Sequence, residues 1–193
     1  RYWLFFVLHH MITDRYSLEL LAREIFTLYG TAPGETLPPL PAIALQYADF
    51  SRWQQRLPDE IMASLLFYWK RKLQGDLQAL ELPTDRPRAA VHIYKEAVHT
   101  FTIPGPISGK LRELGREEGV DSFHILLSAF IILLHRYSGQ DEILVGTGSM
   151  NRHQGGAGGI FGPLANLLVL RNLVRGDSPF RKILAGVVKT TRD

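Results

Sequence analysis

The sequence predicts an α/β fold in two lobes, each a two-layer α+β sandwich. The first observation is the order of elements along the 193 residues, in which apolar strand-like runs alternate with helical periodicities. The second is a proline-rich break, Leu82–Arg88, between two complete hydrophobic patterns. We therefore expect a first lobe in residues 1–81, an inter-lobe crossover in residues 82–90 and a second lobe in residues 91–193.

The composition excludes several classes of function. Hydrophobic residues make up 46% and charged residues 21%, and the net charge of +3 is not gathered in a Lys/Arg run that would bind nucleic acid. The longest apolar run, Ile125–Leu134, is interrupted by Ser128 and is far too short to cross a membrane. The absence of cysteine excludes a cysteine nucleophile and suits a reducing compartment. We therefore expect a cytoplasmic protein that binds neither nucleic acid nor membrane.

The spacing of apolar residues predicts each element in turn. The run Tyr2–Leu8 is apolar throughout and rich in aromatics, which is typical of a strand buried on both faces. Elsewhere, spacings of three and four predict helices, and alternation or short apolar runs predict strands. The further elements expected are helices at Ser17–Tyr29, Ile43–Arg56, Asp59–Leu73, Ile107–Glu118, Asp121–Tyr137 and Ser178–Thr191, and strands at Ala97–Ile103, Glu142–Thr147 and Leu164–Leu170.

Three local patterns refine these expectations. Tyr47, Phe50 and Trp53 form a stripe at spacings of three, which favours core packing. The helix Asp121–Tyr137 is apolar nearly all round, which predicts a central buried helix. Ser178 is expected to cap the last helix.

A glycine-rich stretch separates the last two predicted strands. Gly146–Gly162 holds seven glycines in seventeen residues. It lacks the Lys-Ser/Thr pair of a phosphate-binding loop, and no helix follows it directly. We therefore expect a flexible or tightly turning loop rather than a nucleotide site.

Two histidines and an aspartate follow the first predicted strand. Side chains at the end of a rigid strand are well aimed for catalysis, and the period of two sends His9 and His10 to opposite faces. Only one of them can therefore face a given cleft. The alternatives are a buried structural histidine and, for Asp14, a helix cap or a turn. A metal site is disfavoured because adjacent histidines diverge and cysteine is absent.

The segment His9–Asp14 resembles the HHxxxDG motif of the condensation-domain superfamily of nonribosomal peptide synthetases, which related acyltransferases of the chloramphenicol-acetyltransferase-like fold share. Four further segments resemble motifs of the same family in the same order. They are Gln46–Gln54, Leu82–Arg88, Leu134–Thr147, and the set of Asn151, Arg152, Gly162, Asn166 and Arg171. The resemblance covers essentially the whole chain but only the middle of the family domain. Residues 1–81 would then be the C-terminal part of the family's N-lobe, and residues 91–193 the N-terminal part of its C-lobe.

The resemblance also implies roles for individual residues. His10 would be the catalytic histidine, acting as a base or as a positioner of the amine, and His9 would fix the geometry of the motif. Asp14 would be a structural anchor paired with an arginine. Gly162 and Asn166 would lie along the substrate tunnel. No metal or cofactor would bind directly, because upstream and downstream peptidyl carrier domains, beside a neighbouring adenylation domain, would deliver the substrates on phosphopantetheine arms.

The residues present are compatible with amide formation from a thioester. This reaction needs a neutral, aimed amine and a path for its proton, and an imidazole that is largely neutral at physiological pH can accept that proton. No cysteine is present and no serine lies in a G-x-S-x-G turn, so no covalent nucleophile is indicated. Direct transfer between two bound substrates is therefore favoured.

Two departures from the family pattern leave alternatives open. Arg15 stands where the family has glycine, and Gly155 and Gly156 stand where its glycine-rich loop usually carries a glutamate. His9 argues against a cyclisation domain, which carries aspartate there. The alternatives to condensation are an epimerisation domain, a coenzyme A-dependent acyltransferase of the same fold, and a non-catalytic carrier-docking module.

Asp14 needs a partner if it lies at the mouth of a buried strand, because an uncompensated buried carboxylate is very costly. The candidates are the amides of the following helix, Arg15 and Arg152. Arg15 follows immediately in a turn and is poorly placed for a bidentate contact. By resemblance, the strand before Arg152 leads to the same end of the fold. We therefore predict an Asp14–Arg152 ion pair that braces the histidine loop across the lobe boundary.

Overall fold

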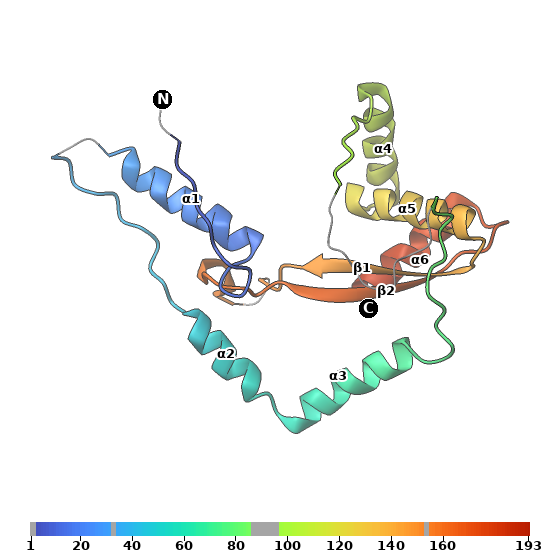
Figure 1. Ribbon diagram of the computed structural model, residues 1–193, viewed down its shortest axis with the longest axis horizontal. Coiled ribbons are helices and arrows are strands. Elements are labelled where there is room, and N and C mark those ends of the chain that lie inside the picture. The colour runs from blue at the N-terminus through green and yellow to red at the C-terminus, as the bar shows by residue number, and fades with distance from the viewer. Residues whose placement is uncertain (1–2, 32–33, 86–96, 153–154) are drawn as a thin grey trace. The chain divides into compact units, whose positions relative to one another are not determined.

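The computed structural model describes residues 3–31, 34–85, 97–152 and 155–193 (Figure 1). Its elements, in chain order, are helices α1 (Arg15–Tyr29), α2 (Tyr47–Gln55), α3 (Asp59–Lys72), α4 (Gly105–Glu118) and α5 (Ser122–Ser138), strand β1 (Glu142–Ser149), the 3₁₀ helix η1 (Ala157–Gly159), strand β2 (Asn166–Leu173) and helix α6 (Phe180–Arg192). Each predicted helix is present, with ends that differ from the expected ones by a few residues at most.

Strands β1 and β2 form a two-stranded sheet. The amide of Val174, just after β2, donates to the carbonyl of Asp141, just before β1, at 2.8 Å. The start of one strand therefore lies beside the end of the other, and the pair is antiparallel. The strands predicted at Glu142–Thr147 and Leu164–Leu170 are both confirmed, with shifted ends.

The chain divides into two compact units, each assembled from segments that are distant in the sequence. The first unit comprises Arg1–Arg71 with Thr147–Leu168, and the second comprises Lys72–Gly146 with Val169–Asp193. Both strands contain a boundary between the units. The predicted crossover at residues 82–90 lies partly outside the described residues, so the lobe boundaries stay a prediction.

The core of the second unit packs α5 and α6 with the sheet residues of that unit. Its buried apolar side chains are Leu127, Ile131, Leu134, Ile143, Leu170, Val174 and Val187. The expectation that α5 is buried all round is wrong, because Phe130 and Leu133 are 47% and 49% exposed. A helix packed on one layer buries a single stripe, whatever the composition of its other face.

Two side chains from the family-like motifs attach the segment after α3 to the second unit. Arg171 Nη1 donates to the carbonyls of Lys72 and Gln74, at 2.9 and 2.7 Å. The side-chain amide of Gln140 donates to the carbonyl of Ala79 at 3.1 Å. These hydrogen bonds hold a stretch that has no helix or strand of its own, so both motif residues have a structural task.

The helix caps differ from the predicted ones at two places. Helix α1 begins at Arg15, two residues earlier than expected, because Asp14 rather than a later residue is its N-cap. Helix α6 begins at Phe180 with Pro179 in the N-cap position and no side-chain cap. The assignment of Ser178 as N-cap is therefore wrong.

Helix α2 begins at Tyr47 rather than at Ile43, and its aromatic stripe is only partly buried. Phe50 packs against a small buried cluster in the first unit, whereas Trp53 is 52% exposed. The cluster consists of Ala157, Ile160 and Leu164. The expectation of core packing therefore holds for Phe50 and fails for Trp53.

Two predicted strands are absent from the described residues. Residues 3–8 have no strand and are exposed, with Phe5 at 82% and Val7 at 96%. Residues 97–103 likewise have no strand, and Phe101 is 75% exposed. A strand needs a hydrogen-bonded neighbour, and β1 with β2 is the only sheet in the described residues. An apolar run alone therefore did not produce a strand here.

Within the described residues, no single helix has the length and apolar character needed to span a membrane. Helices α4 and α5 would meet those two criteria only as a pair, and the pair is bent by 108°.

Candidate active site

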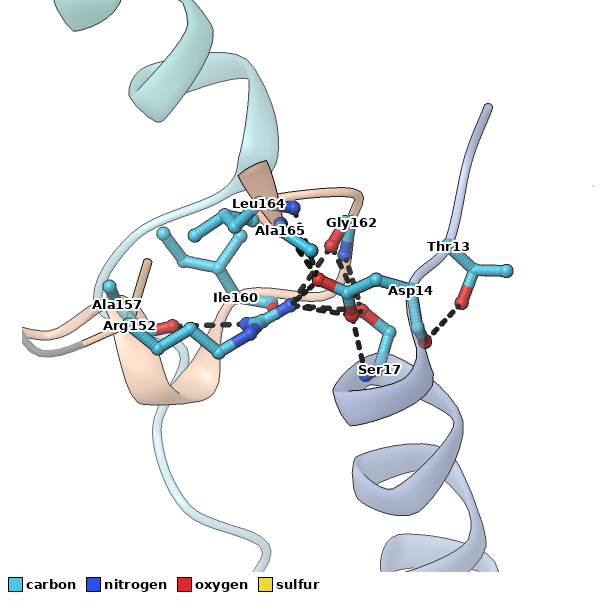
Figure 2. A network of polar contacts seen from close by, with 9 residues as sticks. All are labelled: Thr13, Asp14, Ser17, Arg152, Ala157, Ile160, Gly162, Leu164 and Ala165. Atoms are coloured by element: carbon cyan, nitrogen blue, oxygen red, sulfur yellow. Dashed lines mark hydrogen bonds and ion pairs between the residues drawn. The ribbon is translucent and has the colours of Figure 1, made fainter. Parts of the chain in front are cut away.

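The candidate site is centred on the carboxylate of Asp14, the N-cap residue of α1 (Figure 2). Its backbone is extended, and Oδ1 accepts a hydrogen bond from the amide of Ser17 at 2.8 Å, as an N-cap residue does. Oδ2 accepts from the amides of Leu164 and Ala165, at 3.2 and 3.3 Å. One carboxylate therefore ties the start of α1 to a loop 150 residues away in the sequence.

Arg152 supplies the counter-charge. Its Nη2 lies 2.9 Å from Oδ1 and 3.0 Å from Oδ2 of Asp14, and the two residues are 138 positions apart. Both side chains are 4% exposed. The predicted Asp14–Arg152 ion pair is thus confirmed, and the cap role of Asp14 holds at the same time. Both residues belong to the first compact unit, and the brace across a lobe boundary stays a prediction, as the boundaries do.

The guanidinium of Arg152 also gathers the carbonyls of the glycine-rich loop, here defined as residues 155–165. Nη1 donates to the carbonyls of Ala157 and Ile160, at 3.2 and 2.6 Å, and Nη2 lies 2.9 Å from that of Gly162. One face of the guanidinium stacks over the ring of Tyr16, at 4.4 Å. A planar fork with several donors is required for this arrangement, so lysine could not replace Arg152.

The hydroxyl of Ser17 sits at the centre of the cluster and is completely buried. Its Oγ lies 2.7 Å from Asp14 Oδ1, 3.1 Å from Arg152 Nη2 and 3.0 Å from the amide nitrogen of Gly162. A hydroxyl has one proton and two lone pairs, and a carboxylate is its strongest acceptor here. Ser17 therefore donates to Asp14 and accepts from both Arg152 and Gly162.

Gly162 is required by close packing. A Cβ added at this position would lie 2.7 Å from Cγ of Tyr47, at the start of α2. Real Cβ atoms do not approach a ring this closely, so the Tyr47 side chain would have to move. The amide and the carbonyl of Gly162 both belong to the Asp14–Arg152 cluster. The loop backbone is thus held between α1 on one side and α2 on the other.

The electrostatics keep Asp14 ionised. Burial of the carboxylate acts to raise its pKa, but hydrogen bonds from Ser17 and from Arg152, with the charge of Arg152, outweigh burial and leave the pKa of Asp14 below its ordinary value. A carboxylate in this state is a weak base. In this site, the Asp14 carboxylate therefore acts as a hydrogen-bond acceptor for donors that are held in place.

The two histidines precede this cluster in a tight turn. The amide of Ile12 donates to the carbonyl of His9 at 3.0 Å, and the amide of Met11 donates to His9 Nδ1 at 3.0 Å. His9 Nδ1 is therefore placed as an acceptor, and this hydrogen bond holds the ring to the turn. The His10 side chain is exposed and makes no hydrogen bond to the described part of the chain. Among those residues, no three His, Cys, Asp or Glu side chains gather as a metal site would require.

Two other residues singled out by the sequence lie at the edge of the site. Arg15 is exposed and pairs with Glu19 along the surface of α1, at 3.2 Å. Asn166 is the exposed first residue of β2, and its Oδ1 accepts from the amide of Leu167 at 2.9 Å. Neither side chain contacts the Asp14–Arg152 cluster through a hydrogen bond.

A groove of about 380 Å³ lies beside the loop within the first unit. It is lined by residues of the α2 region (Leu45, Asp49, Phe50 and Trp53), by Asn151 and by residues of the loop (Gly155, Ala157 and Ile160). Arg152 binds the carbonyls of two of these loop residues, Ala157 and Ile160. The groove wall is therefore built on the same cluster as the start of α1.

The sequence reasoning did not identify three contributors to this site: Tyr16, Ser17 and Tyr47. Ser17 lies three positions after the N-cap but is not the Glu or Gln of a capping box, so no local pattern indicated its role. Tyr47 was assigned to a core stripe, and its contact with Gly162 depends on packing that no local pattern encodes.

Comparison with known proteins shows the family to which the chain belongs. A family model described as "Condensation domain" matches residues 1–193, and the chain therefore belongs to the condensation-domain family. It is 42% identical over 186 residues to a linear gramicidin synthase from Brevibacillus parabrevis, an alignment that covers 96% of this chain and 4% of that protein. It is 39% identical over 194 residues to the chondramide synthase cmdD of Chondromyces crocatus, covering 100% of this chain and 5% of that protein. The resemblance noted from the motifs is thus confirmed.

Solved structures confirm the expected chloramphenicol-acetyltransferase-like α/β fold. The SgcC5 protein from Streptomyces globisporus superposes with a TM-score of 0.78 at 29% identity, covering 95% of this chain and 41% of that one. The first condensation domain of the calcium-dependent antibiotic synthetase gives 0.77 at 18% identity, covering 96% and 42%, and shows the fold alone. The chain thus spans well under half the length of these solved structures.

Proposed function

We propose that the chain is part of an acyltransferase that forms a peptide bond in nonribosomal peptide synthesis. The reaction would join a donor acyl or peptidyl thioester to the amine of an aminoacyl acceptor, releasing the donor's thiol. The observation that carries the proposal is the family match over the whole chain, together with a synthase relative at 42% identity. The relatives do not favour epimerisation, coenzyme A-dependent transfer or a purely non-catalytic docking role.

His10 is the residue we assign to catalysis. It is exposed in a turn whose shape is set by the hydrogen bonds of His9, and the helix that follows is anchored by Asp14. A free imidazole there can accept the proton that the attacking amine loses or can orient that amine. His9, whose Nδ1 already accepts the Met11 amide, has a structural role in this proposal.

The proposal places the substrate path along the glycine-rich loop, with Gly162 and Asn166 at its border. The groove beside this loop is lined in part by the apolar side chains of Leu45, Phe50 and Ile160, which suit the aliphatic or aromatic part of a substrate, and in part by the polar Asp49 and Asn151. No metal or cofactor is needed on the chain itself. The substrates would arrive on phosphopantetheine arms of upstream and downstream carrier domains, with an adenylation domain nearby, in the cytoplasm.

The test is dipeptide formation by the complete condensation domain that contains this chain, because the chain alone spans 42% of a solved one. With carrier-bound donor and acceptor thioesters, His10→Ala should lower turnover by about 100-fold or more, the range of a lost acid–base or positioning group. His99→Ala is the matched control, because His99 is also exposed. Turnover of His10→Ala within twofold of the parent, with the fold intact, would remove His10 from the mechanism.

A further inference from the structure

The groove beside the glycine-rich loop is shaped by a residue that does not line it. Ala157 and Ile160 of the loop and Phe50 and Trp53 of α2 are among the residues that line the groove. The ring centroid of Phe50 lies 5.7 Å from that of Trp53 and 6.3 Å from that of Tyr47, so the three aromatic side chains form a contiguous row along α2. Any group that sets the distance between the loop and Tyr47 therefore sets the shape of the groove.

Gly162 is the point at which the loop meets Tyr47. There is no room for a Cβ at Gly162, so the loop backbone touches the ring directly. From the other side, the amide of Gly162 is bound by Ser17 Oγ at 3.0 Å, and its carbonyl by Arg152 Nη2 at 2.9 Å. The only hydrogen bond that the structure gives the Gly162 amide within the described residues is the one to Ser17.

Loss of the Ser17 hydroxyl would leave most of the hydrogen bonds of Asp14 and Arg152 in place. Without the hydroxyl, Arg152 still binds both carboxylate oxygens of Asp14, and Asp14 still binds the amides of Leu164 and Ala165. Asp14, Arg152 and the Gly162 carbonyl each lose one contact but keep others, whereas the Gly162 amide loses its one hydrogen-bond acceptor within the described residues. The hydroxyl thus controls one point of the loop, while the ion pair controls its general attachment.

We propose that Ser17 is a positioning residue: its buried hydroxyl holds Gly162 against Tyr47 and thereby sets the shape of the groove. This inference rests on the proposed function in one respect, namely that the groove is a surface that binds substrate. The chain of contacts runs from Ser17 on α1 through Gly162 to Tyr47, and from there along the aromatic side chains of α2 to Trp53.

The test uses NMR of the complete condensation domain that contains this chain, isotopically labelled at glycine, leucine, alanine and tryptophan so that few amide and indole signals need assignment. In Ser17→Ala, exchange of the Gly162 amide should accelerate about threefold to tenfold, as expected for one lost hydrogen bond. The amides of Leu164 and Ala165 should change less than about twofold, because Asp14 still binds them. The indole N–H signal of Trp53 should shift although Ser17 does not contact it.

Ser64→Ala is the matched control, since Ser64 lies on an exposed position of α3. An unchanged Gly162 exchange rate overturns the proposal, as does a Trp53 shift no larger than the one in Ser64→Ala. A uniform acceleration across Gly162, Leu164 and Ala165 also overturns it, because Ser17 would then be a general structural contact. If Ser17→Ala does not fold, Ser17→Cys under reducing conditions keeps a weaker hydrogen-bonding group and must show the same pattern at smaller size. None of these readouts needs catalysis, so they hold even if the proposed peptide-forming activity fails.

Discussion

Replacing Asp14 with asparagine removes the charge of the buried pair while keeping a residue that caps helices equally well. Every group that faces the carboxylate is a donor: the amides of Ser17, Leu164 and Ala165, the Ser17 hydroxyl and Arg152 Nη2. In either orientation, the NH₂ group of asparagine would meet donors, and the guanidinium would lose its counter-charge. We therefore expect Asp14→Asn to lower the free energy of unfolding by about 3–5 kcal/mol. This is a large share of the roughly 5–15 kcal/mol of a typical domain.

The assay is urea unfolding followed by tryptophan fluorescence. All three tryptophans, Trp3, Trp53 and Trp69, belong to the first unit, so the signal reports the unit that contains the ion pair. Arg152→Gln and the double variant complete a mutant cycle. Because the two residues share one network, the double variant should lose about 1–3 kcal/mol less than the sum of the single losses.

Strict additivity of the two single losses, within about 0.5 kcal/mol, would refute this reasoning. It would mean that Asp14 stabilises the unit only as a helix cap and through the loop amides. A loss of about 1 kcal/mol for Asp14→Ala would lead to the same conclusion, since that is the usual value of a cap alone.

Two further predictions concern acid and the glycine-rich loop. The pKa of Asp14 is lower in the folded state, so its stabilisation is complete above the unfolded value of about 4 and is lost as pH falls through the folded value. The urea concentration at the unfolding midpoint of the first unit should therefore decrease as the pH is lowered below about 4, and it should decrease less steeply in Asp14→Asn. An equal dependence on pH in both proteins would contradict the lowered pKa of Asp14. Gly162→Ala should lower the free energy of unfolding by about 1–3 kcal/mol, because its Cβ collides with Tyr47. Gly159→Ala, where a Cβ meets nothing within 4 Å, is the control, and equal losses in the two variants would show that the Tyr47 contact is not the cause.

The helices were predictable because their signal is local. Apolar spacings of three and four located α3 and α5 to within about a residue at each end, and Gly139 at the end of α5 adopts the left-handed conformation that stops a helix. The run at residues 3–8 has an equally clear apolar pattern and yet forms no strand. The difference is physical: a helix satisfies its own backbone, whereas a strand depends on a partner that its own sequence does not specify.

The candidate site was predictable in part for a different reason. Asp14 and Arg152 are 138 residues apart, and they were paired through the motif resemblance and the cost of burying a lone carboxylate. The contacts of Tyr16 with the guanidinium and of Tyr47 with Gly162 could not be predicted from the cost of burying a charge. These contacts arise from packing in three dimensions, and only the folded chain reveals them.

The geometry separates the tasks of the histidine and the aspartate within the HHxxxD-like segment. A proton acceptor must be reachable and must have a lone pair to spare, but both oxygens of Asp14 already accept from fixed donors and the side chain is 4% exposed. Its lowered pKa makes it a still weaker base. Under the proposed function, proton transfer at this end of α1 is therefore assigned to an imidazole, and His9 is engaged by the Met11 amide through Nδ1. His10 remains free to meet a substrate, while Asp14 anchors the helix that follows the turn in which His10 lies.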